Sequence, residues 1–260
     1  MSSALVRALI LTPAMAVAVA GCGSSPTGPS PTGNASASQS LPLVGETANY
    51  TFRAAAGDTV NTEWQERYHA WLENTLGERA RQKIVFNKYT SRSHMQSVIG
   101  VGNTNAYADP AAYAIHTIWP LDNHEVVHLL TSSWGSAGAL VNEGMAVAFQ
   151  IDPARDMTPR WSGVALHDLT RQFRQQGRFV PIAGLTETTS WRSQDPNVAY
   201  PESGSFMRWL IDQHGLERVR ALYPLIGGSN ESVARVRAAF EAVYGESLDE
   251  LERAWLAFVG

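Results

Sequence analysis

Residues 121–130 read LDNHEVVHLL and place two histidines and a glutamate inside an otherwise apolar run. Asp122 precedes the run as a helix cap would, and Glu125 follows three residues later, as in a capping box. The segment therefore predicts a short helix with a buried face, which would hold its polar side chains in fixed positions. That face would comprise Val126, Val127, Leu129 and Leu130.

His124, Glu125 and His128 form the pattern H-E-x-x-H. On a helix, positions i and i+4 point the same way within roughly 40°, so two imidazoles can bind one Zn²⁺ at about 2.0–2.1 Å. Glu125 is rotated by roughly 100° from His124, which makes it a poor third ligand. It is well placed to act as a general base toward zinc-bound water. The alternative is an amphipathic helix whose H-E-H edge is exposed to solvent.

Glu143, in the segment NEGMA (142–146), is the candidate third metal ligand. A catalytic zinc usually has three protein ligands, and the short loop 131–138 lets a second helix, expected over 138–150, pack antiparallel to the first. A carboxylate among apolar neighbours is costly unless it is exposed or binds a cation. The alternatives are a solvated glutamate near a helix N-terminus and Asp152 as the third ligand.

The combination of HEVVH and VNEGMA resembles the gluzincin metallopeptidases, the thermolysin-like superfamily. More narrowly, it resembles the peptidase-MA-like domains of bacterial envelope proteins. The segments AYPESGSFMRWLIDQHG (199–215) and AFEAVYGESLDELERAW (239–255) extend this resemblance, which covers about residues 60–260. Two features depart from the pattern. Leu140-Val141 stands where the family often has Trp-Leu, and the spacing from His128 to Glu143 is shorter than in thermolysin.

The resemblance implies peptide-bond hydrolysis with Zn²⁺ as the cofactor and a peptide or protein as the substrate. Glu125 would take a proton from water and pass it to the leaving amine. Superfamily members often add a Tyr or His that stabilises the oxyanion, and Tyr200 is the candidate here; the alternative is a packed aromatic residue. His116 and His167 are weaker candidates. The strand expected over 111–119 would be the edge strand with which a substrate pairs.

The N-terminus predicts a lipoprotein signal peptide over residues 1–21. Residues 8–20 form an uncharged apolar run of 13 residues, too short to span a bilayer. The next residues, VAGC (19–22), resemble a bacterial lipobox, and Cys22 is the only cysteine of the chain. We therefore expect lipidation at Cys22 and a lipid anchor in the bacterial cell envelope, at the outer membrane in a Gram-negative host because Gly23 replaces Asp. Ordinary secretion is the alternative.

The remaining sequence predicts a disordered tether over residues 22–44 and one domain over 45–260. Strands are few and early and helices many and late, which favours an α+β fold. We expect a small, mostly antiparallel N-terminal sheet, the H-E-x-x-H helix and a helical C-terminal part. Residues 41–60 would be a propeptide or a leading strand. Strands are expected over 83–90 and 111–120, and further helices over 61–77, 91–100, 163–177, 201–215, 231–245 and 247–259.

Several features of the sequence have no predicted functional role. His69, His94 and His214 are expected to be surface or partly buried residues, and Trp64, Tyr68 and Trp71 to belong to the core. The net charge is −4 and no run of like charge stands out, so no nucleic-acid partner is expected. Two other functions stay open: an envelope binding module that keeps the fold without catalysis, and a hydrolase of another amide, such as a cell-wall bond. No feature predicts the oligomeric state.

Overall fold

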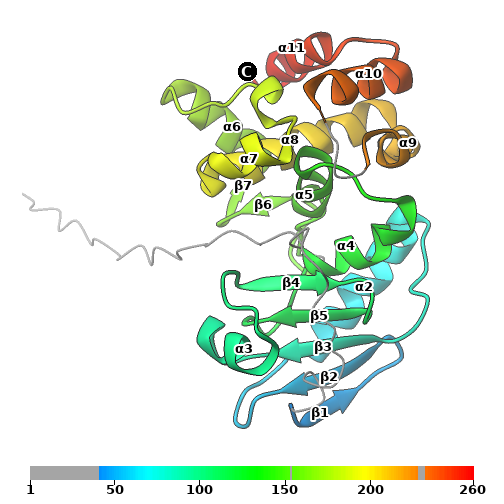
Figure 1. Cartoon of the computed structure of the whole chain (residues 1–260), viewed down its shortest axis with the longest axis vertical. Helices are drawn as coiled ribbons and strands as arrows, with labels where there is room; N and C mark the ends of the chain where they lie inside the picture. Colours follow the sequence, from blue (N-terminus) through cyan, green and yellow to red (C-terminus); the bar gives the residue numbers. More distant parts are fainter. Residues whose placement is uncertain (1–40, 153, 228–231) are drawn as a thin grey trace, which may run out of the picture.

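A computed structural model describes residues 41–152, 154–227 and 232–260. The chain has a mixed α/β fold with a small N-terminal sheet and a mostly helical C-terminal part, as expected. In Figure 1 the sheet forms the lower half of the molecule and the later helices form the upper half. The expected signal peptide, Cys22 and most of the expected tether lie outside the described residues, so those expectations stay predictions.

The described elements match most of the expected ones, with bounds shifted by a few residues. The strands are β1 Leu43–Glu46, β2 Tyr50–Ala54, β3 Ile84–Lys88, β4 Ala106–Asp109, β5 Ala114–Thr117, β6 Arg160–Trp161 and β7 Val164–Ala165. The helices are α2 Thr62–Leu76, α3 Arg92–Ile99, α4 Glu125–Thr131, α5 Ala139–Ala148, α6 Leu166–Gln175, α7 Thr188–Ser193, α8 Pro196–His214, α9 Leu216–Ile226, α10 Val233–Tyr244 and α11 Leu248–Val259. None of the helices within the described ranges has the length and apolar character that a membrane span requires.

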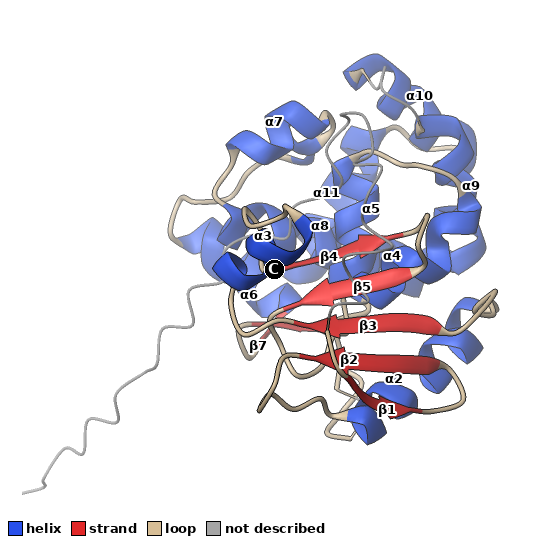
Figure 2. Ribbon diagram, turned by 60° about the horizontal axis from the view of Figure 1, so that its bottom comes forward, coloured by secondary structure: helices blue, strands red, loops and turns tan. Residues whose placement is uncertain are grey.

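The main sheet has the strand order β1-β2-β3-β5-β4 (Figure 2). The outer pairs β1–β2 and β4–β5 are antiparallel, whereas β2–β3 and β3–β5 are parallel. The expectation of a mostly antiparallel sheet is therefore wrong. The reason is that α2 connects β2 to β3 as a crossover, which brings the chain back to the same end of the sheet before the next strand starts.

The sheet also corrects two expectations about individual segments. The strand expected over 111–119 is β5, which lies between β3 and β4 and so cannot be an edge. The edge strands are β1 and β4, and α4 packs against β4. Residues 41–60 form the leading strands β1 and β2, the second of the two alternatives. Because β1 begins at Leu43 and Leu41 is buried, the folded unit starts slightly earlier than residue 45.

The two faces of the sheet are covered by different helices. Phe86 and Ile115 are register partners and belong to the large core that also contains residues of α2 and α4. Their neighbours Asn87 and His116 lie on the opposite face, where Tyr89 and Met95 of the α3 side form a smaller cluster. The face that carries the large core is therefore the one next to α4. The aromatic stripe of α2 packs in this core, as expected, with Trp71 partly buried.

Helices α5 and α8 lie in close contact because glycine stands at both crossing points. A Cβ atom at Gly144 would lie 2.9 Å from the carbonyl oxygen of Ser203, and one at Gly204 would lie 2.3 Å from Cγ1 of Val147. No side chain fits at these separations. The glycines of the EGMA and SGSF segments therefore allow the backbones of α5 and α8 to approach, which brings Glu143 and Tyr200 to the same region.

The C-terminal helices differ from the expectation in where α8 begins and in two helices that were not expected. Helix α8 begins at Pro196 rather than near residue 201, because Asp195 caps it by accepting the N–H of Asn197 at 2.9 Å. Pro201 lies inside the helix instead of starting it, so Tyr200 is a helical residue. Helices α7, Thr188–Ser193, and α9, Leu216–Ile226, were not expected. The capping box that starts α11 is present between Ser247 and Glu250.

Candidate metal centre

The start of α4 is fixed by the carboxylate of Asp122. Its Oδ1 accepts the backbone N–H of His124 at 2.9 Å and that of Glu125 at 2.6 Å. The reciprocal half of the expected capping box does not form, since the N–H of Asp122 donates to Oε1 of Gln65 at 2.9 Å. The side chain of Glu125 is therefore not used as a cap. The helix begins at Glu125, and His124 is its N-terminal flanking residue.

The structure brings His124, His128 and Glu143 together in one cluster, in which His124 and Glu143 are buried and His128 is partly buried. Oε2 of Glu143 lies 3.2 Å from Nε2 of His124 and 3.5 Å from Nε2 of His128, and the two Nε2 atoms are 3.2 Å apart. Within the described ranges, this is the one group of three or more His, Cys, Asp or Glu side chains arranged to hold a metal ion. His124 is 4 % exposed and Glu143 is 1 % exposed, so neither alternative of a solvated edge describes this site.

Asp152, the alternative third ligand, does not belong to this cluster. Its Oδ1 accepts the indole N–H of Trp64 at 2.9 Å and the backbone N–H of Ala154 at 3.0 Å. The side chain thus hydrogen-bonds to the turn that follows α5 and to the start of α2. The expectation that placed Asp152 as a rival of Glu143 is wrong, because its carboxylate is engaged elsewhere.

Electrostatics in the cluster favour an ion pair in the metal-free chain. Burial opposes the charged form of His128, but the hydrogen bond and the negative charge of Glu143 outweigh burial and raise the pKa of His128 to about 9. Burial likewise opposes the carboxylate of Glu143, yet hydrogen bonds from His124 and His128 lower its pKa to about 2. At neutral pH Glu143 is therefore an anion, as a metal ligand must be.

Glu125 lies beside the cluster without belonging to it. The side chain is 2 % exposed, and its Oε1 atom has no hydrogen-bond partner in the part of the chain that is described. Burial raises the pKa of Glu125 to about 7, although the neighbouring His124 lowers it. A carboxyl group that titrates near neutral pH can both accept and return a proton, which suits a general base.

Tyr200 lies next to the cluster and is itself packed among aromatic rings. Its ring centroid is 6.0 Å from that of His124, 5.2 Å from the stacked ring of Trp161 and 4.6 Å from Trp191. The residue is fully buried. The aromatic packing of the alternative interpretation is thus present, and so is the position beside the cluster that a donor needs. A role for its hydroxyl stays a prediction.

The two histidines considered as weaker donors lie elsewhere. His116 is on the α3 side of the sheet, where Nδ1 lies 2.9 Å from the hydroxyl of Tyr89 and the ring stacks on Tyr107. Nδ1 of His167 lies 2.8 Å from the hydroxyl of Ser205. Neither histidine contacts the cluster within the described residues. His69, expected at or near the surface, is wholly buried between α2 and β2, whereas His94 and His214 are half-buried.

Several residues around the cluster were not identified from the sequence. Tyr223 of α9 is buried near Thr131, and burial raises its pKa with a further contribution from the charge of Glu143. Gln65 and Tyr68 of α2 bond to the backbone before α4. No local spacing links these residues to the H-E-x-x-H segment. The one sequence feature that could have pointed to Gln65 is a polar amide on the helix face that also carries Tyr68 and Leu72, because a buried amide needs hydrogen-bond partners.

A second buried carboxyl group, Glu202 of α8, makes stability depend on pH. It accepts the N–H of Val180 at 3.1 Å, and burial raises its pKa from 4.5 to about 8. Between these two pH values the folded chain retains a proton that the unfolded chain loses. The ionisation of Glu202 therefore leaves the free energy of unfolding unchanged below about pH 4.5 and lowers it as the pH rises to about 8. We expect Glu202→Gln to melt at least about 4 °C above wild type at pH 9 and together with it at pH 5. Equal differences in melting temperature at both pH values would contradict this assignment.

Comparison of the chain with known protein families, with curated proteins and with solved structures gives no match.

Proposed function

We propose that this chain is a zinc-dependent metallopeptidase of the gluzincin type, similar to the peptidase-MA-like domains, and that a lipid on Cys22 anchors it in the bacterial cell envelope. In a Gram-negative host the anchor would be in the outer membrane. One observation carries the catalytic part of the proposal. Ligand atoms of the buried His124 and Glu143 and of the partly buried His128 converge, while the carboxylate of Glu125 lies outside their group.

The donor set fits zinc in both chemistry and size. Two imidazole nitrogens and one carboxylate oxygen are a common set for a catalytic zinc, which keeps a fourth position open. A tetrahedral ion at about 2.0–2.1 Å from each donor separates its donors by about 3.3–3.4 Å. The three separations here are 3.2, 3.2 and 3.5 Å. In addition, Oε1 of Glu143 is buried and lacks a hydrogen-bond partner among the described residues. A bound cation would compensate this buried negative charge.

The proposed reaction assigns one role to each group. Zinc, when bound, supplies Lewis acidity toward water and the substrate carbonyl. Glu125 accepts a proton from the attacking water on its carboxylate and returns it to the nitrogen of the leaving amine. The hydroxyl of Tyr200 donates a hydrogen bond to the negative charge that develops on the carbonyl oxygen. Burial at this site strengthens both effects because little water competes.

The position of β4 supports a peptide as the substrate. This strand is one edge of the sheet and packs beside α4, the helix that carries Glu125 and His128. An extended peptide could pair with this edge by β-augmentation, which binds the main chain regardless of side-chain sequence. A binding module that had lost catalysis would gain nothing from the buried Glu125, since an uncompensated carboxylate destabilises the fold.

The first test is metal content followed by digestion. We expect the purified chain to contain about one Zn²⁺ and to cleave members of a random peptide library, with cleavage stopped by a chelator and restored by zinc. A chain that contains no zinc after incubation with excess metal would contradict the proposal. A chain that binds zinc but leaves every peptide intact would favour the binding module or a hydrolase of another amide.

A further inference from the structure

Helix α2 contacts the backbone immediately before α4 through the buried side chain of Gln65. Oε1 of Gln65 accepts the N–H of Asp122 at 2.9 Å, and Nε2 donates to the carbonyl oxygen of Asp122 at 2.8 Å. Gln65 is wholly buried. The amide thus satisfies both backbone groups of the residue whose carboxylate caps His124 and Glu125.

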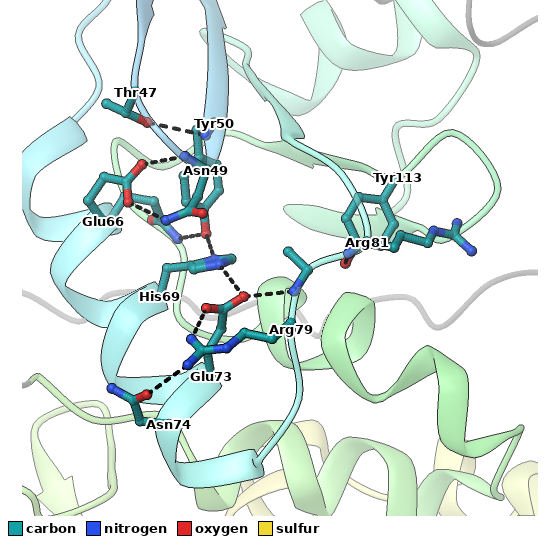
Figure 3. Close-up of polar contacts among 12 residues, drawn as sticks. Thr47, Asn49, Tyr50, Glu66, His69, Glu73, Asn74, Arg79, Arg81 and Tyr113 are labelled. Carbon is teal, nitrogen blue, oxygen red and sulfur yellow. Dashed lines mark hydrogen bonds and ion pairs between the residues drawn. The ribbon is translucent and has the colours of Figure 1, made fainter.

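A chain of buried polar groups fixes the orientation of the Gln65 amide. The second hydrogen on Nε2 points to the hydroxyl of Tyr50 at 3.2 Å, and this hydroxyl lies 3.0 Å from Nδ1 of His69. On the other side of the ring, Nε2 of His69 lies 3.2 Å from Oε1 of Glu73 (Figure 3). Because the hydroxyl of Tyr50 already accepts from Gln65, its own proton is directed to Nδ1 of His69, which acts as the acceptor. A reversed amide would place its NH₂ against the N–H of Asp122.

At the other end of this series of polar groups, the carboxylate of Glu73 bonds to the loop after α2. Oε2 of Glu73 lies 2.6 Å from Nη1 of Arg79, and Oε1 accepts the N–H of Ala80 at 2.7 Å (Figure 3). The amide of Gln65 has hydrogen-bond partners on both of its polar atoms, so a rotation of this amide would break more than one bond. The position of Gln65 is therefore determined from both ends.

Tyr68, one helical turn after Gln65, makes a second connection from α2. Its hydroxyl lies 2.9 Å from the carbonyl oxygen of Asn123 and 2.7 Å from that of Phe149. Asn123 immediately precedes His124, and Phe149 immediately follows α5, the helix that carries Glu143. The side chain of Asn123 adds a hydrogen bond to the carbonyl of Ile151 at 2.9 Å. The start of α4 and the end of α5 are thus joined at one buried hydroxyl.

We propose that Gln65 and Tyr68 are positioning residues for the metal centre, through the backbone of residues 122 and 123. This inference rests on the proposed zinc site and adds to it the groups that set the relative positions of its two helices. Neither side chain is a ligand. Their removal should leave the donor atoms present but less well converged, and outer groups that orient ligands typically change metal affinity by about 10–100-fold.

The test compares two neighbouring substitutions on α2. Gln65→Met removes the contact with Asp122, whereas Glu66→Met removes a similar two-point contact, from the carboxylate of Glu66 to the N–H and Nδ2 of Asn49, at 2.9 and 2.7 Å. Zinc affinity is measured with a competing chelator, the folded state by melting of the metal-free chain, and the site geometry by the absorption spectrum of bound Co²⁺. We expect Gln65→Met to bind zinc at least about 10-fold more weakly with an altered Co²⁺ spectrum. Glu66→Met should match wild type in both.

Tyr68→Phe provides a second variant that removes a single oxygen atom, should Gln65→Met fail to fold. We expect a weaker zinc affinity and a changed Co²⁺ spectrum here as well. If Gln65→Met or Tyr68→Phe folds and binds zinc as wild type does, the positioning role is wrong while the zinc site stands. If Glu66→Met weakens zinc to the same degree, the effect is general destabilisation and the inference fails. If wild type binds no zinc, the proposed function fails, and the inference with it.

Discussion

Glu125→Gln is expected to abolish peptide hydrolysis while about one zinc per chain remains bound. The amide keeps the size of the side chain but cannot accept a proton from water, and general-base catalysis typically contributes 10²–10⁴-fold to the rate. Because Glu125 lies outside the cluster of ligand atoms, its replacement removes no donor from the metal. We expect kcat to fall by at least about 100-fold with KM little changed, measured on a peptide identified from the library digest.

A buried glutamate elsewhere in the C-terminal half provides the matched control. Glu202→Gln makes the same chemical change at a side chain that bonds to Val180 and lies outside the metal cluster. Near neutral pH this control should hydrolyse peptides at the wild-type rate. If Glu125→Gln retained the wild-type rate, Glu125 would not be the base, and if it lost the zinc as well, its role would be structural rather than catalytic.

The parts of the site that sequence predicts are those encoded by local spacing. His124 and His128 lie four positions apart, and one turn of helix places them together wherever that helix packs. Glu143 was predictable because the connection to the next helix is short, so two packed helices have few possible arrangements. The structure adds that the glycines of the EGMA and SGSF segments allow α5 and α8 to approach closely, which the sequence analysis did not anticipate.

The parts that sequence did not predict depend on long-range pairing. The direction of β3 and β5 depends on which end of the sheet α2 and α3 return the chain to, and strands of four or five residues contain little information about that. Asp152 could not be excluded by spacing, because its partner Trp64 is 88 residues distant. Gln65 is 57 residues from Asp122, and its role is visible only when the two backbones are placed side by side.

Glu143 and Asp152 were the two candidates for the third metal ligand, and one substitution at each residue distinguishes them. Glu143→Gln is expected to weaken zinc binding by more than about 100-fold, beyond the range for groups that only orient a ligand. The change removes both a ligand and the negative charge that balances the ion. Asp152→Asn should bind zinc as wild type does, because its oxygen bonds to Trp64 instead.

Proton release gives an independent measure of the same assignment. In the metal-free chain, Glu143 raises the pKa of His128 to about 9, so His128 retains a proton at pH 7 that zinc must displace. Zinc affinity of the wild type should therefore increase with pH up to about 9, with a proton released on binding that calorimetry in buffers of different ionisation enthalpy detects. In Glu143→Gln the cause of the raised pKa is gone, so both the release at pH 7 and the pH dependence should diminish. The opposite result would show that the ligand set is wrong: Asp152→Asn would lose the zinc, and Glu143→Gln would retain both the zinc and the proton release. The carboxylate that binds zinc would then be that of Asp152, in the turn after α5, and not that of Glu143 on α5.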